Sequence, residues 1–380
     1  MALVRDFLHH PRKLWLRRAL FQVHLWAGVL LSLYIFVIGL TGSLLVFEDE
    51  FTEMAAPRIA HYDAAHVAGI PSVVHAAQAA LPTSKIFFII PPTSKSPLYH
   101  VYMQDAAKHR TTLLADPMSG AILSHHGKLW IEWVSDIHIY LLLGDSGIIV
   151  NGVGAAILLV LTASGIVLWW PGIRVWARGL KVNFRHNWRR INFDLHNAIG
   201  IWLLLLISWW AISGVYFAWP FQVGNVVNFF STVKGMRPPV VPPQKPAETM
   251  ASIAPMIEKA KTLSGHGTFS GISTPMDKTD NVIVYIDRGA PGDFSHRDIH
   301  YFSQATGQWL ATWHYGQNQT LGDWFLWAMH PLHFGTLWGW WAKALWFVFG
   351  LSLPALSITG LLMYWNRYLR HRMKKMPQAQ

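Results

Sequence analysis

The stretch INFDLHNAIGIWLLLLISWWAISGVYFAWP, residues 191–220, decides the fold, because it is a long apolar run with a histidine, His196, near its start. An earlier run, LFQVHLWAGVLLSLYIFVIGLTGSLLVF at residues 20–47, carries His24 in the same place. Each run is long enough to cross a bilayer as a helix. The two runs therefore predict two similar membrane-spanning helices, each with one histidine.

The two runs also share a fixed spacing. His196 lies 172 positions after His24, and the same offset separates Gly28 from Gly200, Gly42 from Gly214, and the pair Arg17-Arg18 from the pair Arg189-Arg190. An offset that several features keep indicates an internal duplication.

The composition is typical of a membrane protein. Of the 380 residues, 52% are hydrophobic and only 13% are charged, and 21 are tryptophan. The chain contains no cysteine, which excludes disulfides, iron–sulfur clusters and covalently attached c-type haem.

The net charge of +11 is concentrated in short segments. Residues 1–20, 171–195 and 366–380 together hold 16 of the 31 Lys and Arg residues but only two of the 20 acids. This distribution follows the positive-inside rule and places the three segments in the cytoplasm. It does not indicate a nucleic-acid partner.

The segments between the apolar runs have ordinary polarity. The first has a helix pattern at 72–80 and strand patterns at 85–90, 98–103 and 111–115, and the second has a helix at 252–263 and strands at 281–286 and 298–302. We therefore predict a membrane all-α core of four transmembrane helices, a duplicated two-helix unit, with two small periplasmic α+β domains. The expected segments are a basic N-terminus and first transmembrane helix (1–48), an outer domain with an amphipathic His segment (49–147), a second helix (148–171), a basic cytoplasmic loop (172–190), a third helix (191–220), a second outer domain with its His segment (221–340), a fourth helix (341–366) and a basic tail (367–380).

A histidine inside a membrane-spanning helix is costly and usually functional. A lone one is often bonded to a neighbouring helix, but His24 and His196 lie at equal depth on duplicated helices. Two facing imidazoles suit bis-histidine ligation of a haem. Gly28 and Gly200, one turn further on, either let a porphyrin approach the backbone or allow close helix packing.

A second ligand site is predicted near the other end of these helices. Gly42 and Gly214 lie 18 residues beyond the two histidines, which on a straight helix is about 27 Å along the same face. The candidate ligands nearby are His138, which precedes the second span, and either His330 or His333, which precede the fourth. Alignment of the flanking aromatic residues favours His330.

The arginine pairs have two interpretations. Arg18 and Arg190, with their neighbours, can pair with haem propionates, or they can anchor the helices by the positive-inside rule alone. No G-x-G-x-x-G follows a strand and no P-loop is present, so a nucleotide domain is not predicted.

Several motifs resemble the PepSY-associated transmembrane proteins of bacterial inner membranes. They are HLWAG and TG in the first span, DIHIYLLLGDSG before the second, WWPG after it, FDLHNAIG and SG in the third, and HPLHFG and SITGLLMYW near the end. The resemblance covers nearly the whole chain. That family includes siderophore reductases that bind b-type haem. The resemblance therefore implies two PepSY-like outer domains and two b-type haems. One haem would be held by His24 and His196, and the other by His138 with His330 or His333.

The resemblance implies a ferric-siderophore reductase that lies in the lipid bilayer of the inner membrane, with both termini cytoplasmic, and takes electrons from an unidentified cytoplasmic or membrane donor. The alternatives are a siderophore or iron-chelate transporter, a peptide-binding PepSY module with structural histidines, and a quinol oxidoreductase with the same haems. A transporter predicts a polar path through the spans, which carry few polar residues besides the histidines.

Overall fold

The computed structural model describes residues 15–59, 62–63, 65–126, 128–242, 244, 246, 249–265, 267–289 and 295–370. These residues form two compact units. The helical unit contains the described residues of Met1–Glu48, Val134–Val226 and Ala328–Gln380, and the sheet unit contains those of Asp49–Trp133 and Val227–Trp327. Most of the basic N-terminus and basic tail predicted above lies outside the described residues.

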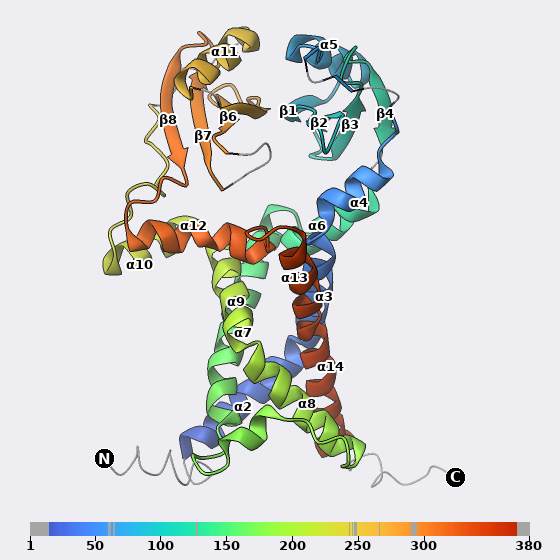
Figure 1. Ribbon diagram of the computed structural model, residues 1–380, viewed down its shortest axis with the longest axis vertical. Helices are drawn as coiled ribbons and strands as arrows, with labels where there is room; N and C mark the ends of the chain where they lie inside the picture. Colours follow the sequence, from blue (N-terminus) through green and yellow to red (C-terminus); the bar gives the residue numbers. More distant parts are fainter. Residues whose placement is uncertain are drawn as a thin grey trace. The chain divides into compact units, whose positions relative to one another are not determined.

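One order of elements occurs twice along the chain (Figure 1). The first copy consists of α2 (Trp15–Leu30), α3 (Ser32–Leu45), α4 (Glu48–Ala55), α5 (Ile70–Ala80), β1 (Lys85–Ile90), β2 (Tyr99–Gln104), β3 (Arg110–Ala115), β4 (Ile122–His126), α6 (Trp130–Tyr140) and α7 (Asp145–Trp169). After the short helix η2 (Trp176–Leu180), the second copy consists of α8 (Trp188–Trp202), α9 (Leu204–Ala218), α10 (Pro220–Phe230), α11 (Ile253–Leu263), β5 (Thr268–Ser273), β6 (Asn281–Asp287), β7 (Arg297–Ser303), β8 (Trp309–Tyr315), α12 (Leu321–Phe334), α13 (Trp340–Gly350), α14 (Ser352–Tyr364) and η3 (Trp365–Leu369).

Two of the four predicted spans are single helices and two are broken. Within the described residues, two helices are long and apolar enough to cross a membrane unaided. They are α7 (Asp145–Trp169) and the continuous helical run Trp340–Leu369, which includes α13, α14 and η3. The helices α2 and α3 meet at a bend of 63°, and α8 and α9 at a bend of 65°. At the first bend, the Ser32 hydroxyl donates to the Val29 carbonyl at 2.8 Å, in competition with the backbone hydrogen bonds of the helix.

The strands of both copies join in a single sheet with the order β4-β3-β2-β1-β5-β6-β7-β8. All neighbouring strands are antiparallel, and the two copies meet where β1 pairs with β5, with Ile89 opposite Ile272. Both side chains are fully buried in one apolar core that also contains residues of α5 and α11. Because the central strands are covered by this shared core, the two copies form one hydrophobic unit.

The predicted fold class is therefore wrong. A core of four spanning helices with two small separate domains would need four unbroken spans and two sheets. The structure has two unbroken spans, or up to four if each bent pair counts as one, and one eight-stranded sheet. The strands β4, β5 and β8 were not predicted, and pairing of β1 with β5 joins residues about 180 positions apart, which no local pattern indicates.

Candidate functional site

The predicted histidine pair His24 and His196 is brought together in the helical unit. The two imidazole centroids are 6.4 Å apart and the ring planes are nearly perpendicular, at 85°. His24 comes from α2 and His196 from α8, and each lies a few residues before the bend in its helix pair. We call these two residues the first pair.

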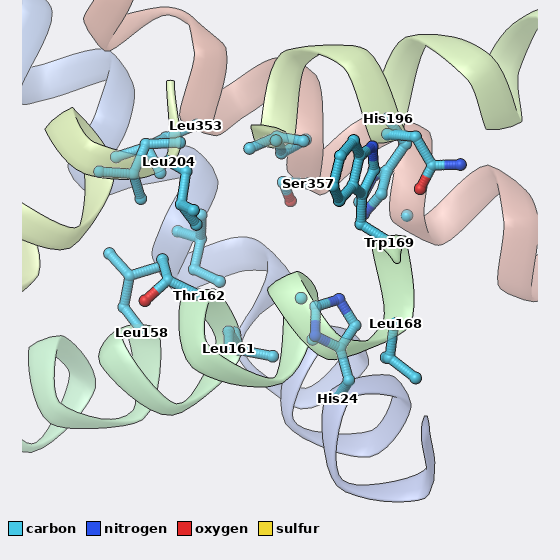
Figure 2. A pocket seen from close by; sticks show the side chains of 18 of the residues that line it. His24, Leu158, Leu161, Thr162, Leu168, Trp169, His196, Leu204, Leu353 and Ser357 are labelled. Atoms are coloured by element: carbon cyan, nitrogen blue, oxygen red, sulfur yellow. The ribbon is translucent and has the colours of Figure 1, made fainter. Parts of the chain in front are cut away.

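The first pair lines a cavity of about 190 Å³. Figure 2 shows His24 and His196 on different sides of this space, with Trp169 beside His196 and leucines along the rest of the wall. Most of the other lining residues are apolar or glycine, and the cavity is partly open. A flat, mainly apolar ligand larger than the cavity can therefore lodge its centre between the two rings.

A second pair has the same spacing. His138 of α6 and His333 of α12 have ring centroids 6.4 Å apart, at an interplanar angle of 63°. His330, which the flanking aromatics favoured, instead stacks on Phe334 at 4.5 Å. The structure thus places His333, rather than His330, opposite His138.

Each of the four histidines bonds through Nδ1 to a hydroxyl on another helix. The partners, with their distances, are Ser164 for His24 (2.9 Å), Thr359 for His196 (2.9 Å), Thr41 for His138 (3.0 Å) and Ser213 for His333 (2.7 Å). Three of these hydroxyls are followed by a glycine whose absent Cβ would lie within 3.6 Å of the same histidine's Cε1, namely Gly42, Gly165 and Gly360. A side chain at Gly42 would approach that carbon to 2.8 Å, so the close approach of His138 requires glycine there.

These contacts define which imidazole nitrogen carries the proton. Each hydroxyl already donates its hydrogen to a backbone carbonyl one turn back, as Thr359 does to Ala355 at 2.7 Å and Ser164 does to Leu161 at 3.1 Å. The hydroxyls of Thr41 and Ser213 do the same. A hydroxyl has one hydrogen, so toward the imidazole it accepts, and Nδ1–H is the donor. Nε2 is then left with a free lone pair, as a metal-binding histidine needs.

Burial reinforces this neutral state in the second pair. Desolvation lowers the pKa of His138 to about 4. Desolvation, aided by the neighbouring His138 and His330, lowers the pKa of His333 to about 3. Both rings are therefore neutral at neutral pH and able to act as ligands.

The spacing of both pairs matches a metal held between two imidazoles. A metal–nitrogen bond of about 2.0–2.1 Å and about 1.1 Å from nitrogen to ring centre would put the two centroids about 6.3 Å apart. Two imidazoles joined directly by a hydrogen bond of about 2.9 Å would be only about 5.1 Å apart. The observed 6.4 Å in each pair fits an intervening metal atom and is too long for a hydrogen bond along the line that joins the two ring centres.

The ligand type follows from the number of protein donors. In the described part of the chain, no group of three or more His, Cys, Asp or Glu side chains is placed to hold a metal ion. Two facing histidines suit a metal whose remaining ligands come from a flat macrocycle, as in bis-histidine haem. The residues present therefore fit this group at both pairs.

The other predicted residues divide between the cavity and helix packing. A Cβ on Gly28 or Gly200 would meet its nearest neighbour only at 4.0 or 3.9 Å, and both glycines line the cavity. A Cβ on Gly214 would come within 2.9 Å of Ala155, so that glycine serves the packing of α9 against α7. The earlier expectation that Gly42 and Gly214 continue a straight histidine face does not hold, because both helix pairs bend.

The predicted arginines have protein partners or face outward. Arg17 donates to carbonyls at the end of α7, including Trp170 at 2.6 Å, and so caps that helix. Arg190 forms an ion pair with Asp194 at 2.9 Å while its side chain remains half exposed. Arg18 is exposed. The structure thus gives Arg17 and Arg190 structural partners within the helical unit.

Residues 21–367 match the family described as "PepSY-associated TM region". This is most of the chain. The chain belongs to this family. The predicted family is therefore confirmed, and the protein is a membrane protein of the PepSY-associated type. No curated protein matches the chain.

Sequence reasoning missed the hydroxyl partners, although a signal was present. A Ser-Gly or Thr-Gly pair occurs in each of the four apolar runs, at 41–42, 164–165, 213–214 and 359–360. Glycines of two of these pairs were singled out, but the preceding hydroxyl residues were not connected to the histidines. Such a connection required knowing which helices face each other.

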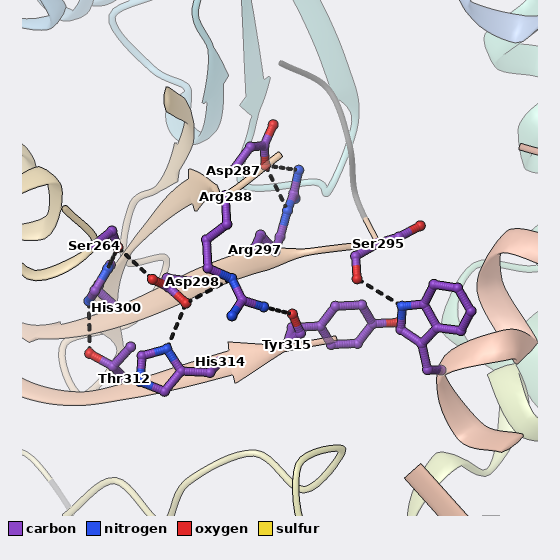
Figure 3. Close-up of polar contacts among 11 residues, drawn as sticks. Ser264, Asp287, Arg288, Ser295, Arg297, Asp298, His300, Thr312, His314 and Tyr315 are labelled. Atoms are coloured by element: carbon purple, nitrogen blue, oxygen red, sulfur yellow. Dashed lines mark hydrogen bonds and ion pairs between the residues drawn. The ribbon is translucent and has the colours of Figure 1, made fainter. Parts of the chain in front are cut away.

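A polar cluster in the sheet unit brings together Ser264, His300 and Asp298 (Figure 3). The Ser264 hydroxyl donates to Asp298 at 2.8 Å, and His300 bonds to Ser264 at 2.7 Å and Thr312 at 2.8 Å. His300 is fully buried, and this burial lowers its pKa. Because the serine proton is held by the carboxylate and the histidine is inaccessible, the cluster joins strands and α11 rather than forming a nucleophile.

The hydroxyl contacts predict a measurable tautomer. In haem-free protein labelled with nitrogen-15 at histidine, the wild type should show His196 as the Nδ1–H tautomer. Thr359→Val keeps the side-chain volume but removes the acceptor, so this preference should be lost, whereas Thr359→Ser should retain it. An unchanged tautomer in Thr359→Val would contradict the assignment.

Proposed function

We propose that this protein is a membrane electron-transfer protein that holds two b-type haems and reduces ferric siderophores. The observation that carries the proposal is the pair of equal 6.4 Å separations between facing imidazoles. His24 and His196 would hold one haem, and His138 and His333 the other. A haem with two histidine ligands carries single electrons without binding a substrate at its iron.

The residues between the two pairs support electron transfer over transport. The buried cluster Ile35, Leu158, Leu161, Ile207, Ala211 and Leu353 is apolar. Five of its members, all but Ala211, line the cavity of the first pair. On α7 and α9, Leu158, Ile207 and Ala211 lie between the positions that contact the first pair and those that contact the second. A transporter needs a polar path at this level, whereas an electron needs none.

The separation of the two pairs follows from α7. Ser164 bonds to His24, and Asn151 donates to the backbone carbonyl of His138 at 2.7 Å. These two residues of one unbroken helix are 13 positions apart, which is about 20 Å along its axis. The two pairs thus lie at two depths along the helix, as a relay across a membrane requires.

The membrane and its orientation are part of the proposal. The clustering of Lys and Arg in the termini and the loop before α8 favours a bacterial inner membrane with these segments in the cytoplasm. The sheet unit would then lie in the periplasm, and an unidentified cytoplasmic or membrane donor would supply the electrons.

The ferric substrate is supported by the resemblance of the motifs to siderophore reductases. In the reaction, chelated Fe(III) gains one electron and becomes Fe(II), and the siderophore leaves unchanged. Hard oxygen donors hold the ferrous ion less tightly than the ferric ion, so reduction releases the iron.

The two candidate ligands of α12 provide a matched test. His333→Ala should lower the haem content of the purified protein to about half, because it removes one ligand of the second pair, whereas His330→Ala should leave the content unchanged. Haem per chain is measured by the pyridine haemochrome method. Loss of haem in His330→Ala with full retention in His333→Ala would reverse the assignment.

The reductase activity has its own test. Anaerobically reduced protein mixed with a ferric trihydroxamate should be reoxidised and yield Fe(II), detected with a ferrous chelator, in an amount equal to the electrons lost. The gallium(III) complex of the same chelator, which has the same shape and charge but is not reduced, should leave the protein reduced. If the ferric complex behaves like the gallium complex, the reductase proposal fails.

A further inference from the structure

Helix α10 presents large apolar side chains that the described residues leave uncovered. Phe229 is 84% exposed and Phe230 is 81% exposed. The first turn of α12 adds Leu321, which is 81% exposed, and Trp324, which is 51% exposed. We call these four side chains the aromatic patch. Contiguous exposed apolar surface of this kind marks a binding site on a stable protein.

The two parts of the aromatic patch are fastened to each other. The backbone N–H of Gly322 donates to the Ser231 hydroxyl at 2.9 Å, and the Thr320 hydroxyl donates to the Thr232 carbonyl. The end of α10 and the start of α12, which both belong to the sheet unit, therefore form one surface.

The exposed side of this surface carries no acid. Helix α10, PFQVGNVVNFF, has no charged residue. The one acid in the first turn of α12, Asp323, is fully buried. Its carboxylate accepts from the backbone N–H groups of Lys234, Met236, Gln319 and Thr320, at 2.8–3.2 Å. Two exposed cations, Lys234 and Arg237, follow α10 within a few residues along the chain.

The position of α10 in the chain identifies the partner. Helix α9, the second part of a candidate span, ends at Ala218, and α10 begins at Pro220. Phe229 is therefore only 11 positions along the chain from the end of a candidate span. Aromatic side chains without charges, followed by cations, are typical of a helix that lies in the interfacial layer of a bilayer.

We propose that the aromatic patch is a lipid-binding surface that inserts into the boundary between headgroups and acyl chains. The phenylalanines, Leu321 and Trp324 would contact acyl chains, while Lys234 and Arg237 would meet lipid phosphates. This anchoring is independent of haem binding.

The other half of the chain supplies a natural comparison. Helix α4 has the corresponding place in the first copy, after α3, but its sequence EDEFTEMA contains four acids. Its Met54 is 82% exposed, almost the same as Phe229. Acidic side chains are repelled by anionic headgroups and costly to desolvate, so α4 remains in water while α10 binds lipid.

Because the chain has no cysteine, single-cysteine labelling tests this directly. Phe229→Cys and the matched control Met54→Cys are each labelled with bimane in phosphatidylcholine–phosphatidylglycerol nanodiscs, with or without lipid that carries a nitroxide high on the acyl chain. The nitroxide should reduce the fluorescence of the Phe229→Cys label by about twofold or more and leave the Met54→Cys label unchanged. Leu321→Cys, on the other segment of the patch, should behave like Phe229→Cys.

Two results would overturn the proposal. Absence of lipid quenching at both Phe229→Cys and Leu321→Cys would place the patch in water. Efficient disulfide cross-linking between two Phe229→Cys chains, with no quenching, would instead identify a second copy of this chain as the partner.

Discussion

The site depends on the hydrogen bond between the Nδ1 of each histidine and a hydroxyl on a different helix. A neutral bond of this kind contributes only about 1 kcal/mol to stability, so its main effect is on orientation. It holds each ring on its Cγ–Nδ1 side and directs Nε2 away from the helix that supplies the hydroxyl. All four rings are held in this way, and orientation of the rings by the protein itself would reduce the cost of binding a ligand between them.

Both sites require both copies of the repeat. The first pair takes His24 from the first copy and His196 from the second, and the second pair takes His138 and His333 in the same way. The sheet shows the same dependence, because β1 and β5 pair across the two copies over a shared core. A single copy would supply half of each site. It would also turn β1 or β5, which are central in the full sheet, into an exposed edge strand.

The sequence identified the membrane character, the family and His24 with His196, because apolar run length, charge distribution and the repeat offset are local or periodic signals. It did not identify the single sheet, which depends on contacts between distant strands. It also assumed straight helices, and the bends after Leu30 and Trp202 invalidate that assumption. His330 and His333 are one turn apart on α12, and their three-dimensional contacts distinguish them, because His333 bonds to Ser213 and lies opposite His138 whereas His330 stacks on Phe334.

The most direct test of the central claim is the visible spectrum of the purified protein, oxidised and dithionite-reduced, with the haem counted per chain. Two facing histidine pairs predict a low-spin b-type spectrum and about two haems per chain. A colourless protein from haem-replete cells would contradict the account, since the paired histidines would then have a structural role only.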